Sequence, residues 1–145
     1  MKKVLLLEDD FFQAEALLED LQQRFASFQI MAIKTEHEFR THLENPAFEP
    51  PILAILDVMA RWTDPAPQMP EAPNDVKQEG YHRAGIRCAK LLRIKYPKLP
   101  IILYSVLEKA DLSETQIFDE HMSFVEKDAT SIRLIEKIKE FVGTR

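Results

Sequence analysis

Two short runs of apolar residues, each followed directly by acids, constrain the fold of this chain more than any other feature. Val4–Leu7 is followed by Glu8 and Asp9. Ile52–Leu56 is followed by Asp57. A continuous apolar run of this length is typical of a strand covered on both faces in a parallel sheet. An unpaired carboxylate is costly beside a buried segment, so we expect these acids to meet at one sheet edge and bind a hard cation.

Two later apolar runs end in polar groups of a different kind. Ile101–Tyr104 leads into the hydroxyl of Ser105, and Met122–Val125 is followed closely by the ammonium of Lys127. Carboxylates, a hydroxyl and an ammonium are the groups with which proteins position and stabilise a transferring phosphoryl group. If the four runs are neighbouring strands, their ends predict a phosphoryl-transfer site.

The whole chain alternates between strand and helix patterns. Strands are predicted at Val4–Leu7, Phe28–Ile33, Ile52–Leu56, Ile101–Tyr104 and Met122–Val125. Helices are predicted at about 11–25, 35–45, 83–95, 108–118 and 129–142. Asp10 and Thr35 stand where an N-cap is expected. Five strand–helix units imply a parallel sheet with right-handed crossovers and helices on both faces, in which ligands bind beyond the carboxyl ends of the strands.

The alternation is interrupted between Arg61 and Gly80. This stretch contains four of the nine prolines and the only tryptophan, Trp62. Neither the helix period nor the strand period survives there, so we predict a long loop with stiff, extended pieces and Trp62 as a packing anchor. Loops of this length in compact domains are usually functional or disordered.

Length and composition indicate one ordinary globular domain. The 145 residues are 46% hydrophobic and 30% charged, and no apolar run approaches the length of a membrane span. The basic start is followed by too few apolar residues for a signal peptide, so a cytoplasmic location is expected, with no membrane partner. A net charge of −5 argues against direct nucleic-acid binding. The single cysteine, Cys88, excludes an internal disulfide.

Four sequence pieces resemble the receiver domain of two-component response regulators, the CheY-like family. They are VLLLEDD at 4–10, ILDVM at 55–59, IILYS at 101–105 and FVEK at 124–127. The resemblance implies a flavodoxin-like (βα)5 fold with strand order 2-1-3-4-5 and helices on both faces. It implies a single receiver domain over residues 1–145, interrupted by a proline-rich insertion at about 61–82.

The resemblance also implies roles for individual acids. Asp57 would be the phosphoacceptor and would bind Mg²⁺ together with Asp9. Glu8 would reach the same Mg²⁺ through a water molecule, and the backbone carbonyl of Met59 would complete the protein ligands. Such a receiver is not a conventional enzyme, because it catalyses only the phosphorylation and dephosphorylation of its own aspartate.

Three further residues acquire expected roles in phosphoryl binding and switching. Ser105 and Lys127 would contact phosphoryl oxygens, and Phe124 would be the aromatic residue that moves when Ser105 turns toward the phosphate. Judged without the resemblance, Phe124 is more simply a core residue. The implied partners are a histidine kinase or phosphotransfer protein and a downstream effector protein, with a homodimer left open.

The chain departs from the family pattern at four places. Arg61 stands where proline is usual, and Asp128 replaces the proline that usually follows the lysine, so we expect a trans bond after Lys127. Val106 replaces a small residue and is expected to slow dephosphorylation. Some twenty residues are inserted before Gly85. Our hypothesis for this insertion is partner specificity, although a lid or a dimer contact would use the same position.

Two other functions compete with a phosphorylated receiver. A pseudo-receiver would keep the fold and the acids but act by binding, without phosphorylation; the changes at Asp128 and in the insertion favour it. An aspartyl-phosphate hydrolase would need a second aspartate two residues after the nucleophile to act as acid and base, and that position holds Met59. The hydrolase is therefore the weakest of the three hypotheses.

Overall fold

The structure is a computed structural model that describes residues 2–64, 67–80, 83–106 and 119–143. Its elements are β1 (Lys2–Leu7), α1 (Phe11–Arg24), β2 (Phe28–Ile33), α2 (Glu36–Glu44), β3 (Leu53–Leu56), α3 (Asn74–Glu79), α4 (Ala84–Lys95), β4 (Ile101–Ser105), β5 (Met122–Glu126) and α5 (Ile132–Val142). The strands form one parallel sheet in the order β2-β1-β3-β4-β5. The predicted fold class and strand order are therefore confirmed.

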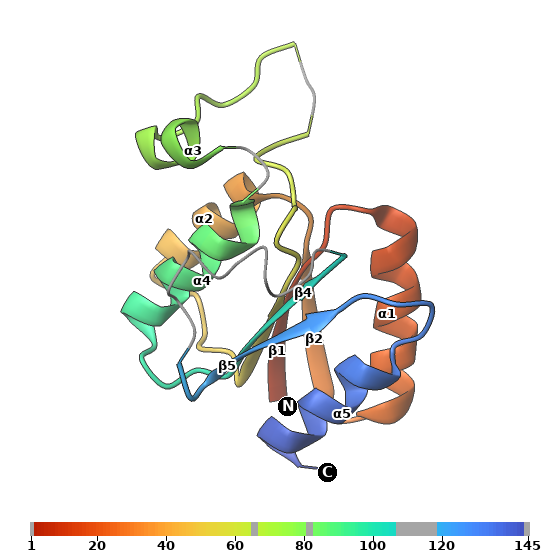
Figure 1. Ribbon diagram of the computed structural model, residues 1–145. Helices are drawn as coiled ribbons and strands as arrows, with labels where there is room; N and C mark the ends of the chain where they lie inside the picture. The colour runs from red at the N-terminus through yellow and green to blue at the C-terminus, as the bar shows by residue number, and fades with distance from the viewer. Residues whose placement is uncertain (1, 65–66, 81–82, 107–118, 144–145) are drawn as a thin grey trace.

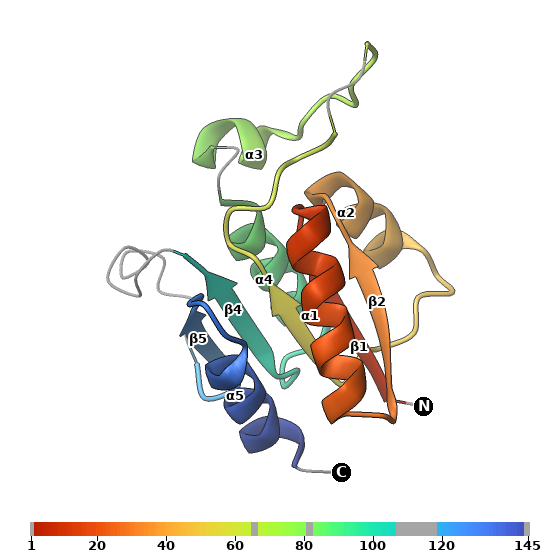
Figure 2. The ribbon, with the colours of Figure 1, turned by 90° about the vertical axis from the view of Figure 1, so that its right-hand side faces the viewer.

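Helices cover both faces of the sheet, as the continuous apolar strands require. Along β1, Leu5 and Leu7 belong to a core beneath α2 and α4, whereas Val4 and Leu6 belong to a core beneath α1 and α5. Figures 1 and 2 show these two helical layers on opposite sides of the sheet. Because successive residues of a strand point to opposite faces, a strand buried on both faces has no polar position until it ends.

Local capping explains where the first two helices begin. The Asp10 carboxylate accepts a hydrogen bond from the Gln13 amide at 3.0 Å, and the Thr35 hydroxyl accepts one from the Glu38 amide at 3.2 Å. Each bond satisfies an amide that the first helical turn leaves without a backbone partner. Both caps were predicted from the sequence.

Gly85 fixes how closely α4 approaches the end of β3. A Cβ atom at Gly85 would lie 2.6 Å from Val58 Cα and closer still to the Asp57 carbonyl oxygen. The Gly85 amide also donates to the Val58 carbonyl at 3.0 Å. Only glycine allows this approach, so the helix holds the backbone that follows β3 in one position.

The described parts of the segment from 61 to 80, residues 61–64 and 67–80, contain more regular structure than the predicted loop. It contains helix α3 after Pro73, and Gly80 ends this helix with φ +101°. Trp62, Ala72 and Val76 form a small core of their own. The proline-rich composition obscured the helix, because the last proline comes just before it and six residues are too few to show a period. The predicted packing role of Trp62 is confirmed by its 5% exposure.

A buried ion-pair network ties this segment to α2 and α4. Glu36 and Arg87 are 0% and 2% exposed, and the guanidinium of Arg87 binds both oxygens of Glu36 at 2.9 and 2.7 Å. Arg40 bridges Glu36 at 2.8 Å to Asp75 of α3 at 2.7 Å. Arg87 also donates to the Gly80 carbonyl at 2.6 Å. No pattern in the sequence indicates this network.

The C-terminal part agrees with the sequence expectations, with one shift of boundary. The predicted helix from 129 begins instead at Ile132, because the Asp128 carboxylate accepts a hydrogen bond from the Thr130 amide at 2.8 Å and forms a turn. No peptide bond among the described residues is cis, so the bond after Lys127 is trans as expected. The helix predicted at 108–118 lies outside the described residues. Within the described parts of the chain, no helix has the length and apolarity to cross a membrane.

Candidate functional site

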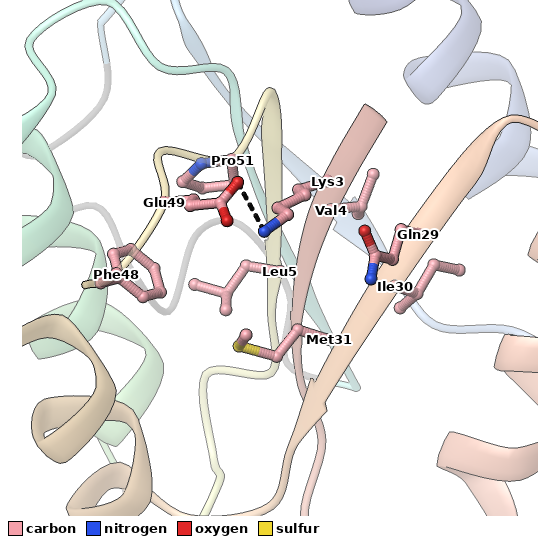
Figure 3. A pocket seen from close by; sticks show the side chains of 9 residues that line it. All are labelled: Lys3, Val4, Leu5, Gln29, Ile30, Met31, Phe48, Glu49 and Pro51. Carbon is pink, nitrogen blue, oxygen red and sulfur yellow. Dashed lines mark ion pairs between the residues drawn. The ribbon is translucent and has the colours of Figure 1, made fainter. Parts of the chain in front are cut away.

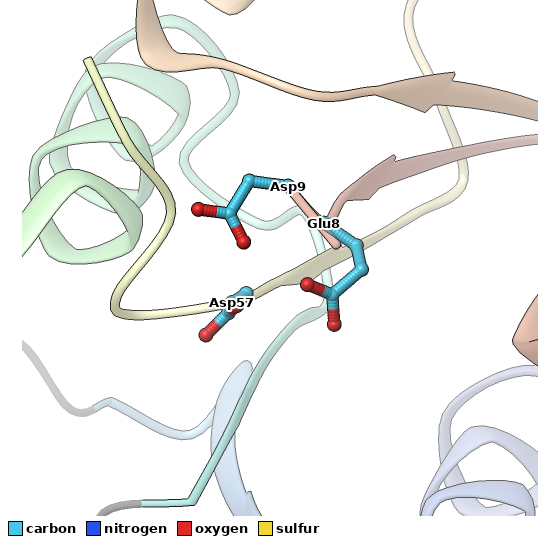
Figure 4. Close-up of side chains that lie close together, drawn as sticks. All are labelled: Glu8, Asp9 and Asp57. Atoms are coloured by element: carbon cyan, nitrogen blue, oxygen red, sulfur yellow. The ribbon is translucent and has the colours of Figure 1, made fainter. Parts of the chain in front are cut away.

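Strand pairing brings the predicted acids to one place. β1 and β3 are adjacent with Leu7 opposite Leu56, so the residues that follow them are neighbours. The Asp57 amide donates to the Leu7 carbonyl at 2.9 Å. Glu8, Asp9 and Asp57 each offer a carboxylate oxygen within 4.8 Å of the others, and Figure 4 shows the three side chains gathered beyond the strands. We call these three residues the acid cluster.

Lys127 reaches the acid cluster from β5, on the far side of β4. Its backbone amide donates to the Ser105 carbonyl at 2.7 Å, which fixes the turn after β5. Its ammonium lies 2.6 Å from Glu8 Oε1 and 3.4 Å from Asp57 Oδ2. It also donates to Gln13 Oε1 at 3.1 Å. One cation is therefore shared between two of the three acids.

Burial and crowding alter the acidity of this site. Burial raises the pKa of Glu8 from 4.5 to about 7, opposed by the hydrogen bond from Lys127 and assisted by the negative charge of Asp57. For Lys127, burial alone would lower the pKa, but Asp57 and Glu8 together outweigh burial and raise it. The ammonium therefore stays charged near neutral pH, whereas Glu8 holds a proton part of the time.

The donor set of the acid cluster fits a hard divalent cation. Its three oxygens come from carboxylates, and the described part of the chain brings no sulfur or imidazole ligand to them. Mg²⁺ prefers one or two carboxylates and keeps several waters, which suits a cluster that is open on one side. A cation would also favour the ionised form of Glu8 by offsetting repulsion between the acids.

The other predicted residues lie around the acid cluster at different depths. The Met59 amide donates to Asp57 Oδ1 at 3.1 Å, and this residue is 38% exposed. Ser105 is fully buried at the end of β4. Phe124 is half-buried opposite Leu103 and packs against the core beneath α2 and α4. Contacts thus join the acids and Lys127 directly, while Phe124 packs into the neighbouring core.

Two residues at the site were not recognised from the sequence. Arg61 donates from its backbone amide and its side-chain Nε to Asp9 Oδ2, at 3.1 and 3.3 Å. The ring of Tyr104 lies 5.4 Å from the Lys127 ammonium, which is a cation–π contact. The unusual arginine was noticed as a departure from the family pattern, but nothing in the sequence indicated its partner. The sequence indicated Tyr104 only as the last residue of a predicted strand.

A hollow of about 320 Å³ adjoins the lysine side of the acid cluster. Glu8, Tyr104, Val106 and Lys127 are among its lining residues. Val106 is 65% exposed at this opening. Val106 thus contributes an apolar side chain to the wall of this hollow, and its effect on dephosphorylation stays a prediction.

A second hollow, of about 260 Å³, lies along the first halves of β1 and β2, next to the loop that precedes β3 (Figure 3). Leu5, Met31 and Phe48 give it apolar walls. Lys3 and Glu49 form an ion pair of 2.7 Å at this hollow, so their charges compensate each other. It shares no lining residue with the acid cluster and does not include the last residues of the strands, beyond which parallel sheets bind ligands.

Comparisons with known proteins agree with this geometry. The sequence matches no protein-family model and no curated protein. Among solved structures it resembles the response regulator TrrA from Thermotoga maritima in complex with Mg²⁺-BeF, with 22% identity, a TM-score of 0.66, and coverage of 97% of this chain and 99% of that one.

Two further structures show the same similarity. The non-phosphorylated HemR receiver domain from Leptospira biflexa is 19% identical, with a TM-score of 0.65 and coverage of 100% and 97%. A response regulator receiver protein from Sinorhizobium medicae is 18% identical, with a TM-score of 0.68 and coverage of 97% and 94%. At these identities the similarity is one of fold, and it extends over nearly the whole chain. The protein thus has the fold of response regulator receiver domains.

Proposed function

We propose that this protein is a receiver that accepts a phosphoryl group on Asp57 in a Mg²⁺-dependent reaction. The observation that carries the proposal is the position of Asp57, with two further carboxylates within 4.8 Å and the Lys127 ammonium at 3.4 Å. An aspartate used only as a helix cap or a surface charge does not require three acids and one half-buried lysine in one place. The donor would be a phosphohistidine of a kinase or phosphotransfer protein.

The chain's own residues supply most of what this transfer requires. An Asp57 carboxylate oxygen would form the new bond to phosphorus while the bond to the histidine nitrogen breaks, and the hydrogen bond from the Met59 amide holds the carboxylate in place. Lys127 would stabilise negative charge on the phosphoryl oxygens. Mg²⁺, held by Asp9, Asp57 and the Met59 carbonyl and through water by Glu8, would supply further positive charge.

Switching would follow from new contacts made by the phosphoryl group. Phosphorylation adds roughly −1.5 to −2 charges and strong acceptor oxygens. Ser105, buried at the end of β4, would turn its hydroxyl toward them, and Phe124, half-buried on the next strand, would change position in response. A downstream effector protein would bind the altered surface, and the extent of the change is limited by the free energy these contacts provide.

The test is incubation with Mg²⁺ and acetyl phosphate or phosphoramidate, followed by measurement of intact mass. We expect one phosphoryl adduct in the parent protein, none in Asp57→Asn, and strong loss in Asp9→Asn. Asp20→Asn, at an exposed aspartate of α1 outside the acid cluster, is the matched control and should retain the adduct. A parent protein that stays unmodified would contradict the proposal.

The same experiment distinguishes the alternative functions. A pseudo-receiver, favoured by Asp128 after Lys127, would bind its partner equally well as parent protein and as Asp57→Asn, with no adduct in either. Sustained turnover of an added phosphoester would indicate the hydrolase. Met59 at the position of the required second acid argues against that outcome, and so we propose no activity beyond self-phosphorylation and dephosphorylation.

The segment from 61 to 80 would contribute partner specificity. It is folded around Trp62 and held by Arg40 and Arg87, so it presents a defined surface next to the acid cluster. Deleting residues 64–80 should change partner choice while Asp57 can still be modified by acetyl phosphate. Unchanged partner choice after the deletion would exclude this role. We further propose that the protein works in the cytoplasm as one receiver domain over residues 1–145.

A further inference from the structure

Arg61 connects the acid cluster to the segment that follows β3. Its amide and its side-chain Nε both donate to Asp9 Oδ2, at 3.1 and 3.3 Å. Its carbonyl accepts a hydrogen bond from the Glu36 amide at 2.9 Å, at the first turn of α2. The backbone is therefore fixed at both polar groups, whereas the side chain is 45% exposed and free to leave Asp9 without unfolding the segment.

The guanidinium occupies the same carboxylate that a divalent cation would use. Asp9 contributes one of the three clustered oxygens, and its side chain is 19% exposed. With every group ionised, three acids and Lys127 carry a net charge of −2. Arg61 adds one positive charge beside Asp9, although its Nη1 also lies 3.5 Å from the exposed Asp64. A cation that binds Asp9 must therefore work against a positive charge already in place.

We propose that the side chain of Arg61 is a tethered competitor of Mg²⁺ at Asp9. The inference rests on the proposed metal site and adds a control on it, because the ion pair and the metal cannot both use Asp9 fully. By linkage, metal binding weakens the hold of Asp9 on Arg61 to the same extent that Arg61 weakens metal binding. The occupancy of the acid cluster is thereby coupled to the start of the folded segment.

Trp62, the next residue and the only tryptophan, provides a direct reporter of this coupling. Its indole Nε1 donates to the Pro70 carbonyl at 3.1 Å, and its carbonyl accepts from the His37 amide at 2.8 Å. Its ring is nearly buried against α2. Residues 61 and 62 are consecutive, and both of their carbonyls accept hydrogen bonds from the start of α2. A change in the contacts of Arg61 should therefore alter the surroundings of this ring, and tryptophan emission should follow the titration of the protein with Mg²⁺.

The experiment compares Mg²⁺ affinity, measured by calorimetry and by tryptophan emission, in the parent protein and in Arg61→Ala. We expect Arg61→Ala to bind Mg²⁺ about threefold to fivefold more tightly, the range that a partly exposed ion pair supports. Arg61→Lys should fall between the two, because it keeps the charge but not the guanidinium. The backbone contacts of residue 61 survive in both variants, and circular dichroism would verify that each is folded.

Lys77→Ala is the matched control. Lys77 belongs to the same segment and pairs with Glu71 at 2.9 Å, so its removal changes the net charge equally without touching Asp9. Its Mg²⁺ affinity should equal that of the parent protein. Equal affinity in Arg61→Ala and the parent protein would overturn the inference, as would equal tightening in Arg61→Ala and Lys77→Ala.

Asp9→Asn separates failure of this inference from failure of the proposed function. If Asp9→Asn loses Mg²⁺ while Arg61→Ala binds it like the parent protein, the metal site stands and the competition is wrong. If neither the parent protein nor Arg61→Ala binds Mg²⁺, the proposed metal-dependent function fails and this inference fails with it.

Discussion

Two groups of charged side chains lie near each other in this protein and are built in opposite ways. In the acid cluster, three carboxylates share Lys127 and Arg61, and the group is open to solvent on one side. Between α2, α3 and α4, Glu36 receives hydrogen bonds from two guanidinium groups and is fully buried. The first group carries more negative than positive charges. In the second group, the charges of Glu36 and Asp75 are balanced by those of Arg40 and Arg87.

The difference teaches what each group can do. A buried pair whose hydrogen bonds are satisfied holds one geometry, because separation of the partners leaves an uncompensated charge in the interior. A crowded cluster of acids gains from any added cation, so its charge state responds to metal, protons and phosphate. We therefore expect variants of the ion-pair network to change stability. Variants of the acid cluster should change how the protein responds to metal, protons and phosphate.

The largest predicted effect is the loss of stability when the ion-pair network around Glu36 is broken. Glu36→Ala leaves Arg87 buried without its carboxylate partner, which should lower the free energy of unfolding by about 3–5 kcal/mol. Denaturant unfolding would measure this change. Glu44→Ala, at an exposed position of the same helix, is the control and should change the unfolding free energy by less than about 0.5 kcal/mol. Similar values for both variants would refute the stabilising role of the network.

The second prediction concerns pH in the absence of metal. The pKa of Glu8 is raised from 4.5 to about 7, so the folded protein binds more protons than the unfolded chain between these values. The contribution of Glu8 to stability should then fall as pH rises through that window, by on the order of 3 kcal/mol in total. The pKa of Lys127 is raised above 10.5, so its contribution is constant there.

Glu8→Gln isolates this effect. Unfolding measured with a chelator from pH 4.5 to pH 7.5 should show a smaller fall in stability for Glu8→Gln than for the parent protein. Added Mg²⁺ should reduce the fall in the parent protein, because the cation favours the ionised carboxylate. Parallel pH profiles for the two proteins would show that Glu8 is not the group responsible.

The two groups also differ in how far the sequence predicts them. Glu8, Asp9 and Asp57 each follow a fully apolar run, and parallel strands bring their carboxyl ends to one edge, so their meeting follows from the pattern. Lys127 was predicted in the same way from the end of the last strand. The strand order, by contrast, was predicted only from the resemblance to receiver domains, because the positions of strands along a sequence do not specify which strands are neighbours in the sheet.

The ion-pair network has no comparable pattern in the sequence. Glu36 is the first residue of a polar helix, and Arg87 lies fifty-one positions later in another helix. Charged residues in such helices are usually exposed, and nothing local distinguishes these two. Helix α3 was missed for a related reason, since its stability comes from the contacts of Val76 with Trp62 and Ala72 rather than from its six residues.

A third prediction tests the connection between the two groups. Gly85 lies against Asp57 and Val58 and stands two residues before Arg87 on α4. Gly85→Ala should destabilise the fold by about 1–3 kcal/mol, because the new methyl group meets backbone that cannot move aside. It should also lower the rate of modification of Asp57 by acetyl phosphate. Stability and modification rates equal to those of the parent protein would contradict the close packing.

The smallest predicted effect is on the open side of the acid cluster. Val106 is 65% exposed and lines the hollow next to Glu8 and Lys127. We expect water to reach a phosphorylated Asp57 from this side. Val106→Ala should speed the loss of the phosphoryl group by about threefold, equivalent to roughly 0.65 kcal/mol in activation free energy. Loss of the adduct mass over time would measure the rate. Equal or slower decay in Val106→Ala would show that access past residue 106 does not limit hydrolysis. Because Val106 is far more exposed than Glu36, the unfolding free energy of Val106→Ala should stay within about 0.5 kcal/mol of the parent value. The two measurements together separate control of water access from support of the fold.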